Sequence, residues 1–199
     1  MKPKRKKKSS KKGRGGKILF FLILIGIGLI ILFHQQIYDS FKPWLEKWSL
    51  VEKRREVLLY FSDSEGEFLI GEKRGILKKS EVKEEAKETI SELLKGPKGK
   101  LTPTLPPRTK LLTLQINDVG VAKVNFNSAL SKDHPGGSTA EMMTVYSIVN
   151  SLALNFPQIK RVQFLIDGKP IETIAGHISL KQPVSPKFDL IKRPSKDNN

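Results

Sequence analysis

One stretch of this sequence has no charged residue and constrains the chain more than any other feature. Every position from 18 to 33 is Ile, Leu, Phe or Gly, and the uncharged stretch continues to residue 38, giving 21 positions. At about 1.5 Å per residue, a helix of this length covers roughly 30 Å, the thickness of the hydrocarbon core of a bilayer. A buried helix of a soluble protein would be expected to have a polar face, which is missing here. Residues 18–38 are therefore predicted to form a transmembrane helix.

The charges that flank this segment predict how the chain crosses the membrane. Ten Lys and Arg residues lie in the tail formed by residues 1–17, whereas three lie among the 20 residues after Phe33. Because the more basic flank stays inside, the N-terminus is predicted to be cytoplasmic and the C-terminal domain extracytoplasmic. A cleaved signal peptide is the alternative, but it would end in small residues and the first alanine is Ala86. We expect an uncleaved signal anchor in a single-pass protein of the cell membrane.

Most of the net charge of +16 comes from this tail, since the rest of the chain has 26 basic against 20 acidic residues. A basic tail could bind nucleic acid, but membrane orientation and anionic lipid headgroups already account for it, so no nucleic-acid partner is expected. The sequence has no cysteine. This excludes disulfides, Cys-ligated metals, a Cys nucleophile and a lipid-modified cysteine.

The segment after the predicted span, residues 39–55, is predicted to be an amphipathic juxtamembrane linker. Phe41, Trp44 and Trp48 continue from Ile37 at helical spacing, and both tryptophans of the chain lie on this stripe. Aromatic side chains with one polar edge favour the membrane interface, so we expect the segment at the outer surface. The alternative is a short stalk helix that packs on the folded domain or on a partner.

Residues 56–185 are expected to form one folded domain, and its first part reads as strand, turn, strand and helix. Residues 56–61 form an apolar run that ends at the turn cluster 62–66, and extended character returns at 68–70. An amphipathic helix is predicted from Ser80, as its N-terminal cap, to Leu94, because Gly96-Pro97 would end it there.

The second part repeats this order and adds a last hairpin. Residues 112–116 and 122–126 alternate around a turn, and a helix is predicted from Ser138 to Phe156, with Glu141 completing a capping box. Residues 162–166 then lead through Asp167-Gly168, a strong hairpin signal, to a returning strand at 171–174.

The predicted order of elements is therefore ββα, ββα, ββ, preceded by one transmembrane helix. This order is typical of an α+β fold, with two amphipathic helices over one face of a mixed or antiparallel sheet. Residues 186–199 are expected to be a flexible tail.

Five short motifs in this domain together resemble the GerMN domain, the sporulation and spore-germination module. They are Leu93-Leu94-Lys95-Gly96-Pro97, Leu105-Pro106-Pro107-Arg108-Thr109, Val124-Asn125-Phe126-Asn127, Gly136-Gly137-Ser138-Thr139-Ala140-Glu141 and Phe164-Leu165-Ile166-Asp167-Gly168. The resemblance covers about residues 57–183. It implies a single-copy, membrane-anchored bacterial domain that is extracytoplasmic and not known for catalysis, with a fold similar to ring-building domains. Better-known members are implicated in a cell-envelope channel complex between mother cell and forespore.

The histidines give no convincing catalytic or metal site. The chain has His34, His134 and His177, and His34 lies in the predicted membrane segment. Asp133 and His134 precede two glycines, but neighbours in a chain seldom face one ligand together, so we expect a solvated loop. His177 is expected to be a hydrogen-bonded structural residue.

The remaining motifs have structural explanations as well. Residues 96–102 superficially resemble a phosphate-binding loop, but the spacing is wrong and they follow a helix. Ser138 is explained by helix capping, and Asp63 and Asp167 by turn formation. No catalytic residue, metal ligand or cofactor is predicted, and the protein is not expected to be an enzyme.

Two functions from different classes follow. The favoured hypothesis is a scaffold or interaction protein of the cell envelope, whose partners are the cytoplasmic membrane and envelope proteins in a homo- or hetero-oligomeric ring. The alternative is an envelope ligand-binding module for peptidoglycan or another anionic polymer, suggested by Lys98, Lys100, Arg108 and Lys110 around the proline loop, residues 105–109. Binding of an acidic polymer would be salt-sensitive.

Overall fold

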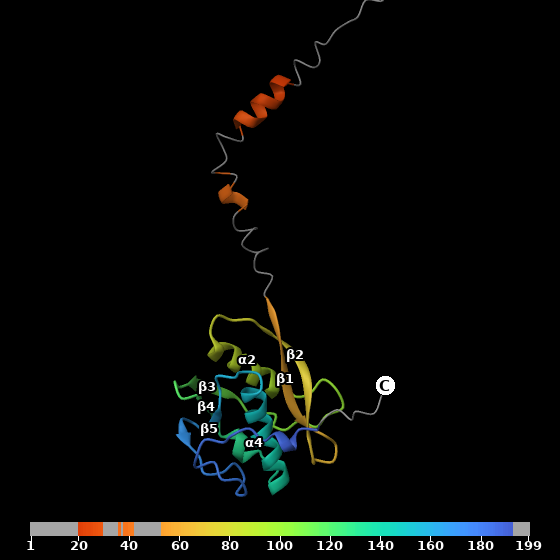
Figure 1. Ribbon diagram of the computed structural model, residues 1–199, viewed down its shortest axis with the longest axis vertical. Coiled ribbons are helices and arrows are strands. Elements are labelled where there is room, and N and C mark those ends of the chain that lie inside the picture. Colours follow the sequence, from red (N-terminus) through yellow and green to blue (C-terminus); the bar gives the residue numbers. More distant parts are fainter. Residues whose placement is uncertain (1–19, 30–35, 37, 42–52, 193–199) are drawn as a thin grey trace, which may run out of the picture. The chain divides into compact units, whose positions relative to one another are not determined.

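The computed structural model describes residues 20–29, 36, 38–41 and 53–192 (Figure 1). The chain divides into two compact units, Met1–Val51 and Glu52–Asn199, which we describe separately.

In the first unit, residues 20–29 are helical and their large apolar side chains are exposed. Among the residues described, we find no helix with both the length and the apolar character needed to span a bilayer. The predicted span 18–38 lies only partly within the described residues, so the transmembrane helix stays a prediction. The basic tail 1–17 and the Trp44 and Trp48 positions of the linker lie outside them.

The second unit contains the predicted hairpins and helices in the predicted order, together with one extra helical turn, α3. The elements are β1 (Arg54–Ser62), β2 (Leu69–Leu77), α2 (Val82–Leu94), β3 (Leu111–Ile116), β4 (Val121–Phe126), α3 (Ala129–Lys132), α4 (Ser138–Ala153), β5 (Arg161–Ile166), β6 (Lys169–Pro170) and the 3-10 turn η1 (Phe188–Leu190). The α+β class is confirmed.

Strands β1 and β2 form a long antiparallel hairpin that stands as its own two-stranded sheet. Its turn is held by Asp63, whose Oδ1 accepts the backbone N–H groups of Glu67 and Phe68 at 2.9 and 3.2 Å. β2 runs for nine residues, well beyond the predicted 68–70, because pairing with β1 extends to Leu77. Its glycines and charged residues carry little strand signal in sequence.

The other sheet has the order β3-β4-β5-β6, with β4 and β5 parallel and the other pairs antiparallel. Asp167 and Gly168 both have positive φ, 45° and 80°, and form the predicted tight turn before β6. The predicted strand at 171–174 is wrong, because pairing with β5 ends at Pro170 and is followed by one backbone hydrogen bond, from Ile171 N–H to the carbonyl of Phe164 at 3.4 Å.

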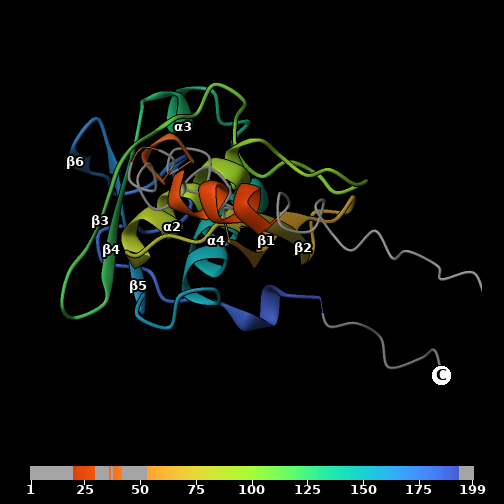
Figure 2. The same ribbon diagram turned by 90° about the horizontal axis from the view of Figure 1, so that it is seen from above.

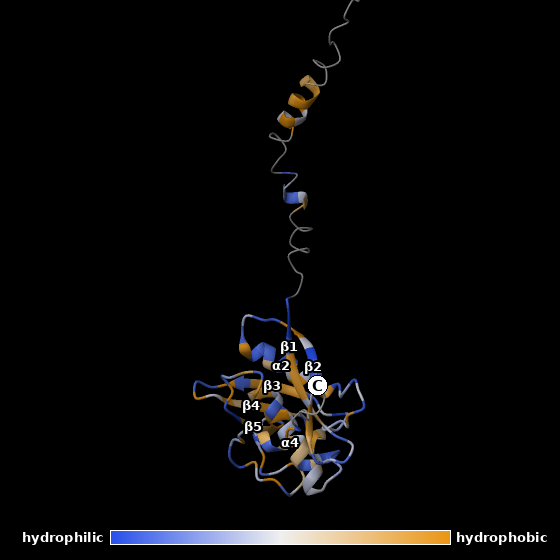
Figure 3. Ribbon diagram, turned by 45° about the vertical axis from the view of Figure 1, so that its right-hand side comes forward, coloured by the Kyte–Doolittle hydropathy of each residue, from blue (hydrophilic) through white to orange (hydrophobic). Residues whose placement is uncertain are grey.

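Helices α2 and α4 lie between the two sheets, as Figures 1 and 2 show from perpendicular directions. The expectation of one sheet with helices over one face is therefore wrong. The apolar faces of both sheets point toward the helices, and Figure 3 shows the hydrophobic residues gathered on the strands and helices of this interior. The largest fully buried side chains are Phe61, Phe126, Phe156, Phe164, Leu59, Leu69, Ile76, Ile90, Leu93, Leu114, Leu130 and Ile148.

Polar side chains of α4 explain why β1 does not join the larger sheet. The Ser151 hydroxyl accepts the N–H of Tyr60 at 3.0 Å, and the Ser147 hydroxyl donates to the carbonyl of Tyr60 at 2.6 Å. Asn155, one turn further, bonds both the N–H and the carbonyl of Leu58 at 2.9 and 2.7 Å. The helix thus closes the edge of β1 as a neighbouring strand would.

The predicted helix starts differ from the structure in their capping. α2 has Glu81 rather than Ser80 at its N-cap position, and α4 has Gly137 there, with Ser138 as its first residue. Neither end has a side-chain cap hydrogen bond, so the capping box of Ser138 and Glu141 is wrong. The physical reason is that Glu141 binds a distant loop instead.

The folded domain also continues beyond residue 185. The Asn150 side chain binds the N–H and the carbonyl of Lys187 at 3.0 Å each, and Lys192 donates its N–H to the carbonyl of Leu69 at 3.0 Å. Leu190 is buried. Residues 187–192, expected to be flexible, are thus packed against α4 and β2.

Candidate functional site

A groove of about 760 Å³ lies at the end of the domain where β1 finishes and α4 begins. We call it the tip groove. Its walls come from three segments that are distant in sequence: the β1–β2 turn 62–66, residues 102–107, which lead into the proline loop 105–109, and residues 133–144. The first and second segments are joined where Ser62 and Thr102 exchange backbone hydrogen bonds of 3.2 and 2.8 Å.

Asp133 at the rim of this groove is paired with an arginine. Nε and Nη2 of Arg108 donate to the two carboxylate oxygens of Asp133 at 2.8 and 2.6 Å, a two-bond arrangement that fixes geometry as well as charge. The side chain of Asp133 is 19% exposed, whereas that of Arg108 is 79% exposed. The loop at Asp133 is therefore tied to the proline loop, and solvent still reaches part of it, since Pro135 and Gly137 are exposed.

His134 uses both ring nitrogens within the protein. Its Nδ1 accepts the N–H of Gly136 at 3.0 Å, and its Nε2 lies 3.0 Å from the hydroxyl of Thr144. That hydroxyl donates its proton to the carbonyl of Thr104, at 2.5 Å, so Nε2 must be the donor to Thr144. Burial lowers the pKa of His134 and outweighs the opposing charge of Glu141. His134 is thus a neutral structural residue with its tautomer fixed.

Glu141, on the first turn of α4, has no exposed surface. Its Oε1 accepts the Thr173 hydroxyl at 2.5 Å and the N–H groups of Ile174 and Ala175 at 2.8 and 3.0 Å. Its Oε2 accepts the N–H of His177 at 2.7 Å. Burial raises the pKa of this carboxyl, but the hydrogen bonds outweigh it and leave the pKa below its ordinary value. Glu141 therefore holds the 173–177 loop against α4.

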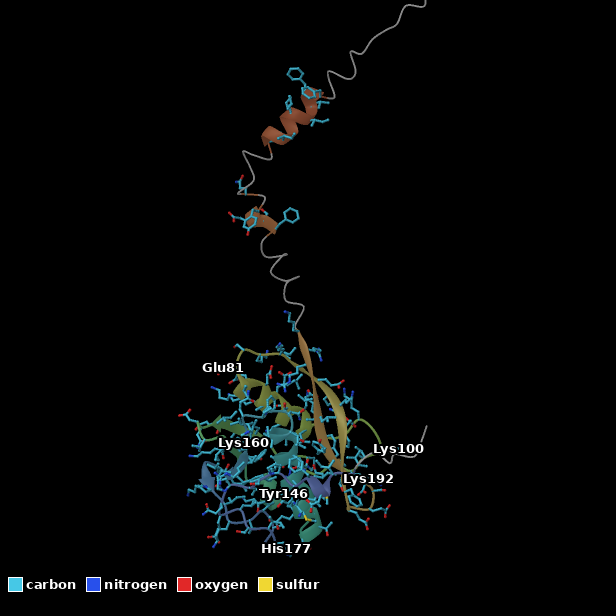
Figure 4. All side chains as sticks on the ribbon, viewed as in Figure 1. Glu81, Lys100, Tyr146, Lys160, His177 and Lys192 are labelled. Carbon is cyan, nitrogen blue, oxygen red and sulfur yellow. The ribbon has the colours of Figure 1, made fainter. Side chains whose placement is uncertain are left out.

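Sequence reasoning missed this role of Glu141, because a glutamate three residues after a serine is typical of a capping box. No separate signal in the sequence marks this role, because the partners of Glu141 lie 32 to 36 residues further along the chain. His177 contributes its backbone N–H, while its side chain lies at the surface (Figure 4). No hydrogen bond of its ring is present among the described residues, so the expected structural role of the imidazole is not seen.

The loop that superficially resembles a phosphate-binding loop is bound to β2. Glu72 accepts the N–H groups of Lys98 and Gly99 at 3.0 and 3.1 Å, and Arg74 donates to the carbonyl of Gly96 at 2.8 Å. Arg74 is buried, and it also pairs with Glu72 and Glu92. Burial raises the pKa of Glu72, but Arg74 and the two N–H groups outweigh it and lower the pKa. The backbone N–H groups of Lys98 and Gly99 are thus bound to Glu72 and do not point to a phosphate site.

The other residues singled out in the sequence are turn or helix residues. Ser138 is the exposed first residue of α4 and Asp167 lies in the β5–β6 turn. Asp63 is different, because it is buried in the β1–β2 turn and also lines the tip groove. In the part of the chain that the structure describes, there is no cluster of three His, Asp or Glu side chains that could hold a metal ion.

The four basic residues expected around the proline loop lie in two different places in the structure. Arg108 and Lys110 line a hollow of about 540 Å³ together with Lys132 and Asp133. Lys98 and Lys100 do not line it, and the loop between them is bound to Glu72 of β2. The four residues therefore do not line one hollow.

Comparison with known proteins identifies the family to which this chain belongs. The family model described as Germane: Sporulation and spore germination matches residues 58–172, more than half of the chain. A search of the curated proteins finds no match.

Several solved structures have the same fold. The first GerMN domain of the sporulation protein GerM from Bacillus subtilis has a TM-score of 0.54 at 19% identity, covering 66% of this chain and 97% of that one. The tandem GerMN domains of the same protein have a TM-score of 0.52 at 17% sequence identity, and the match covers 69% of this chain and 48% of that one. A "Putative Lipoprotein" from Clostridium perfringens has a TM-score of 0.50 at 24% sequence identity, and the match covers 71% of this chain and 95% of that one. The chain spans about half of the tandem protein, and we conclude that it belongs to the GerMN (Germane) family with a single copy of the domain.

Proposed function

We propose that this protein is a membrane-anchored, extracytoplasmic scaffold or interaction protein of the bacterial cell envelope that serves sporulation or germination complexes. One observation carries the proposal: the side chains of His134, Glu141 and Asp133, beside the tip groove, are bound to other groups of the protein. His134 uses both nitrogens, Glu141 accepts four hydrogen bonds and Asp133 is paired with Arg108. A catalytic acid, base or nucleophile must be free to reach its substrate.

The family supports the process in this proposal, since it is described by sporulation and spore germination and is not known for catalysis. The sequence supports the location, through the uncharged stretch 18–38 and the ten basic residues before it. Partners are then the cytoplasmic membrane and envelope proteins, assembled with this domain in a homo- or hetero-oligomeric ring.

Topology and tethering give the direct test. Protease added outside spheroplasts should digest the chain beyond about residue 38 and leave the 1–17 tail protected. An exported version without residues 17–33 should fail to complement a deletion strain, because tethering raises local concentration to roughly millimolar. Full complementation by the untethered domain, or a mature chain that lacks residues 18–33, would contradict the proposal.

A second candidate is binding of an anionic envelope polymer, and the hollow lined by Arg108, Lys110 and Lys132 favours it. Asp133 neutralises Arg108, which leaves the two lysines to bind the polymer. The paired substitutions Lys110→Gln and Lys132→Gln should then abolish salt-sensitive binding to purified cell-wall sacculi. The same change at the exposed Lys123 and Lys169 is the matched control. Equal binding by both double variants would remove this candidate.

A further inference from the structure

The tip groove has acidic and apolar walls, whereas the chain outside the 1–17 tail has a small excess of basic residues. Its described lining includes Asp63, Glu65 and Asp133 but no Lys, Arg or His, although that part of the chain has 26 basic against 20 acidic residues. Since Arg108 neutralises Asp133, the charge available to a ligand comes from Asp63 and Glu65. Coulomb attraction therefore favours a cationic ligand.

Asp63 is the best-placed anchor in this groove. The residue is 8% exposed, and its Oδ1 is occupied by the two N–H groups of the turn. No donor in the described part of the chain bonds Oδ2, and the residue lines the groove. A carboxylate oxygen held in one position by its partner atom can accept a charged donor with little loss of side-chain freedom.

The rest of the groove suits a peptide rather than a small cation. Pro103, Leu105, Pro107 and Met143 supply apolar surface. The volume of about 760 Å³ is within the usual range of ligand pockets. In α4 the first helical hydrogen bond is made by the N–H of Glu141. The N–H groups of Ser138, Thr139 and Ala140 have no partner among the described residues and can bind peptide carbonyls.

The groove also lies at the far end of the domain from the point where the chain enters it. β1 begins at Arg54 and ends at Ser62 beside the groove, so nine extended residues separate the two, about 26 Å.

We propose that the tip groove docks a short, extended, basic segment of a partner protein, with a Lys or Arg side chain on Asp63 and apolar neighbours on the proline loop. This inference rests on the proposed interaction function and names the surface that would perform it. The tip groove adjoins the basic hollow of the second candidate and shares Pro107 and Asp133 with it, but that hollow would take an acidic ligand.

Two variants test the groove with matched controls. Asp63→Asn keeps Oδ1 for the turn but removes the charge, and Asp118→Asn makes the same change in the exposed β3–β4 turn. Thr139→Lys adds a positive charge where the walls approach, since a Cβ on Gly66 would lie 3.6 Å from Cγ2 of Thr139. Thr113→Lys makes that change on an exposed position of β3.

The probe is a labelled peptide, acetyl-Lys-Leu-Lys-Leu-Lys-Leu-amide, titrated into the full chain in nonionic detergent and followed by fluorescence anisotropy. Asp63→Asn and Thr139→Lys should weaken binding about tenfold or more, while both controls bind as the wild type does. The peptide with Glu in place of Lys should not bind. No binding to the wild type, equal binding of the Glu peptide, or equal binding by Asp63→Asn and Asp118→Asn would overturn the proposal.

A photo-crosslinking residue placed in cells at position 139 or 113 separates this inference from the proposed function. An envelope protein captured from position 139 and lost in the Asp63→Asn background supports both. Capture from position 113 alone overturns the docking groove and leaves the interaction function standing. No capture from either position, together with full complementation by the untethered domain, overturns both.

Discussion

Replacing Glu141 by glutamine tests the buried carboxylate that holds the 173–177 loop. If the amide oxygen takes the place of Oε1, it can still accept from Thr173, Ile174 and Ala175, but without the charge. The amide nitrogen would then face the N–H of His177, so two donors would meet. The substitution therefore keeps the volume of the side chain and removes its charge and one acceptor.

The expected loss of stability follows from these bonds. A hydrogen bond to a charged group contributes about 1.5–3 kcal/mol and a neutral one about 0.5–1.5 kcal/mol, and a buried N–H without a partner costs about 1–3 kcal/mol. A neutral amide is less costly to bury, which offsets part of the loss. We expect Glu141→Gln to lower the free energy of unfolding by about 2–4 kcal/mol, a fall in Tm of roughly 5–15 °C.

Urea unfolding of the full chain in nonionic detergent, followed by circular dichroism, measures this loss, and hydrogen exchange at residues 174–177 localises it. Glu172→Gln is the control, because the Glu172 side chain is 74% exposed in the same segment. It should change stability by at most about 0.5 kcal/mol. The structural role of Glu141 would be refuted if Glu141→Gln and Glu172→Gln had the same free energy of unfolding and the same hydrogen exchange in the 173–177 loop.

The pH dependence gives an independent check. The pKa of Glu141 is lower in the folded state than its ordinary value of 4.5. Its stabilisation is therefore fully present above pH 4.5 and is lost as the pH falls through the lower folded value. The difference in stability between wild type and Glu141→Gln should accordingly narrow in acid. A constant difference down to the acid transition would contradict the assigned cause.

Three other predictions concern single residues. The pKa of His134 is lowered in the folded state, so protonation of this residue favours the unfolded state. In thermal melts the Tm of the wild type should therefore fall as the pH drops below 6.5, and the Tm of His134→Gln should fall less. Gly120→Ala should cost about 1–3 kcal/mol in urea unfolding, since φ is +80° and a Cβ would lie 2.7 Å from the carbonyl of Gln158; an unchanged midpoint would contradict the clash. Arg74→Met should cost about 3–5 kcal/mol in the same assay, because it leaves the part-buried Glu72 without its cation, and a neutral result would show that Glu72 is stabilised by the loop alone.

Local features of the sequence determined the hairpin turns and the ends of several elements. The Asp167-Gly168 pair predicts a tight hairpin turn, because such a turn needs positive φ at both central positions and these two residue types tolerate it. Both residues have positive φ in the structure. Gly96, with φ of 78°, ends α2 close to the predicted position. These features depend on the conformational range of one or two residues, so the sequence alone is sufficient to predict them.

The pairing of strands and the roles of polar residues were decided by tertiary structure. Alternation of apolar residues marks a strand but does not say which edge it joins, and Ser147 and Ser151 became partners of β1 because the fold laid α4 along that edge. Glu141 looks the same in sequence whether it caps its own helix or binds a loop more than 30 residues away. A buried carboxylate takes the donors that folding brings to it, and those donors are distant in the chain.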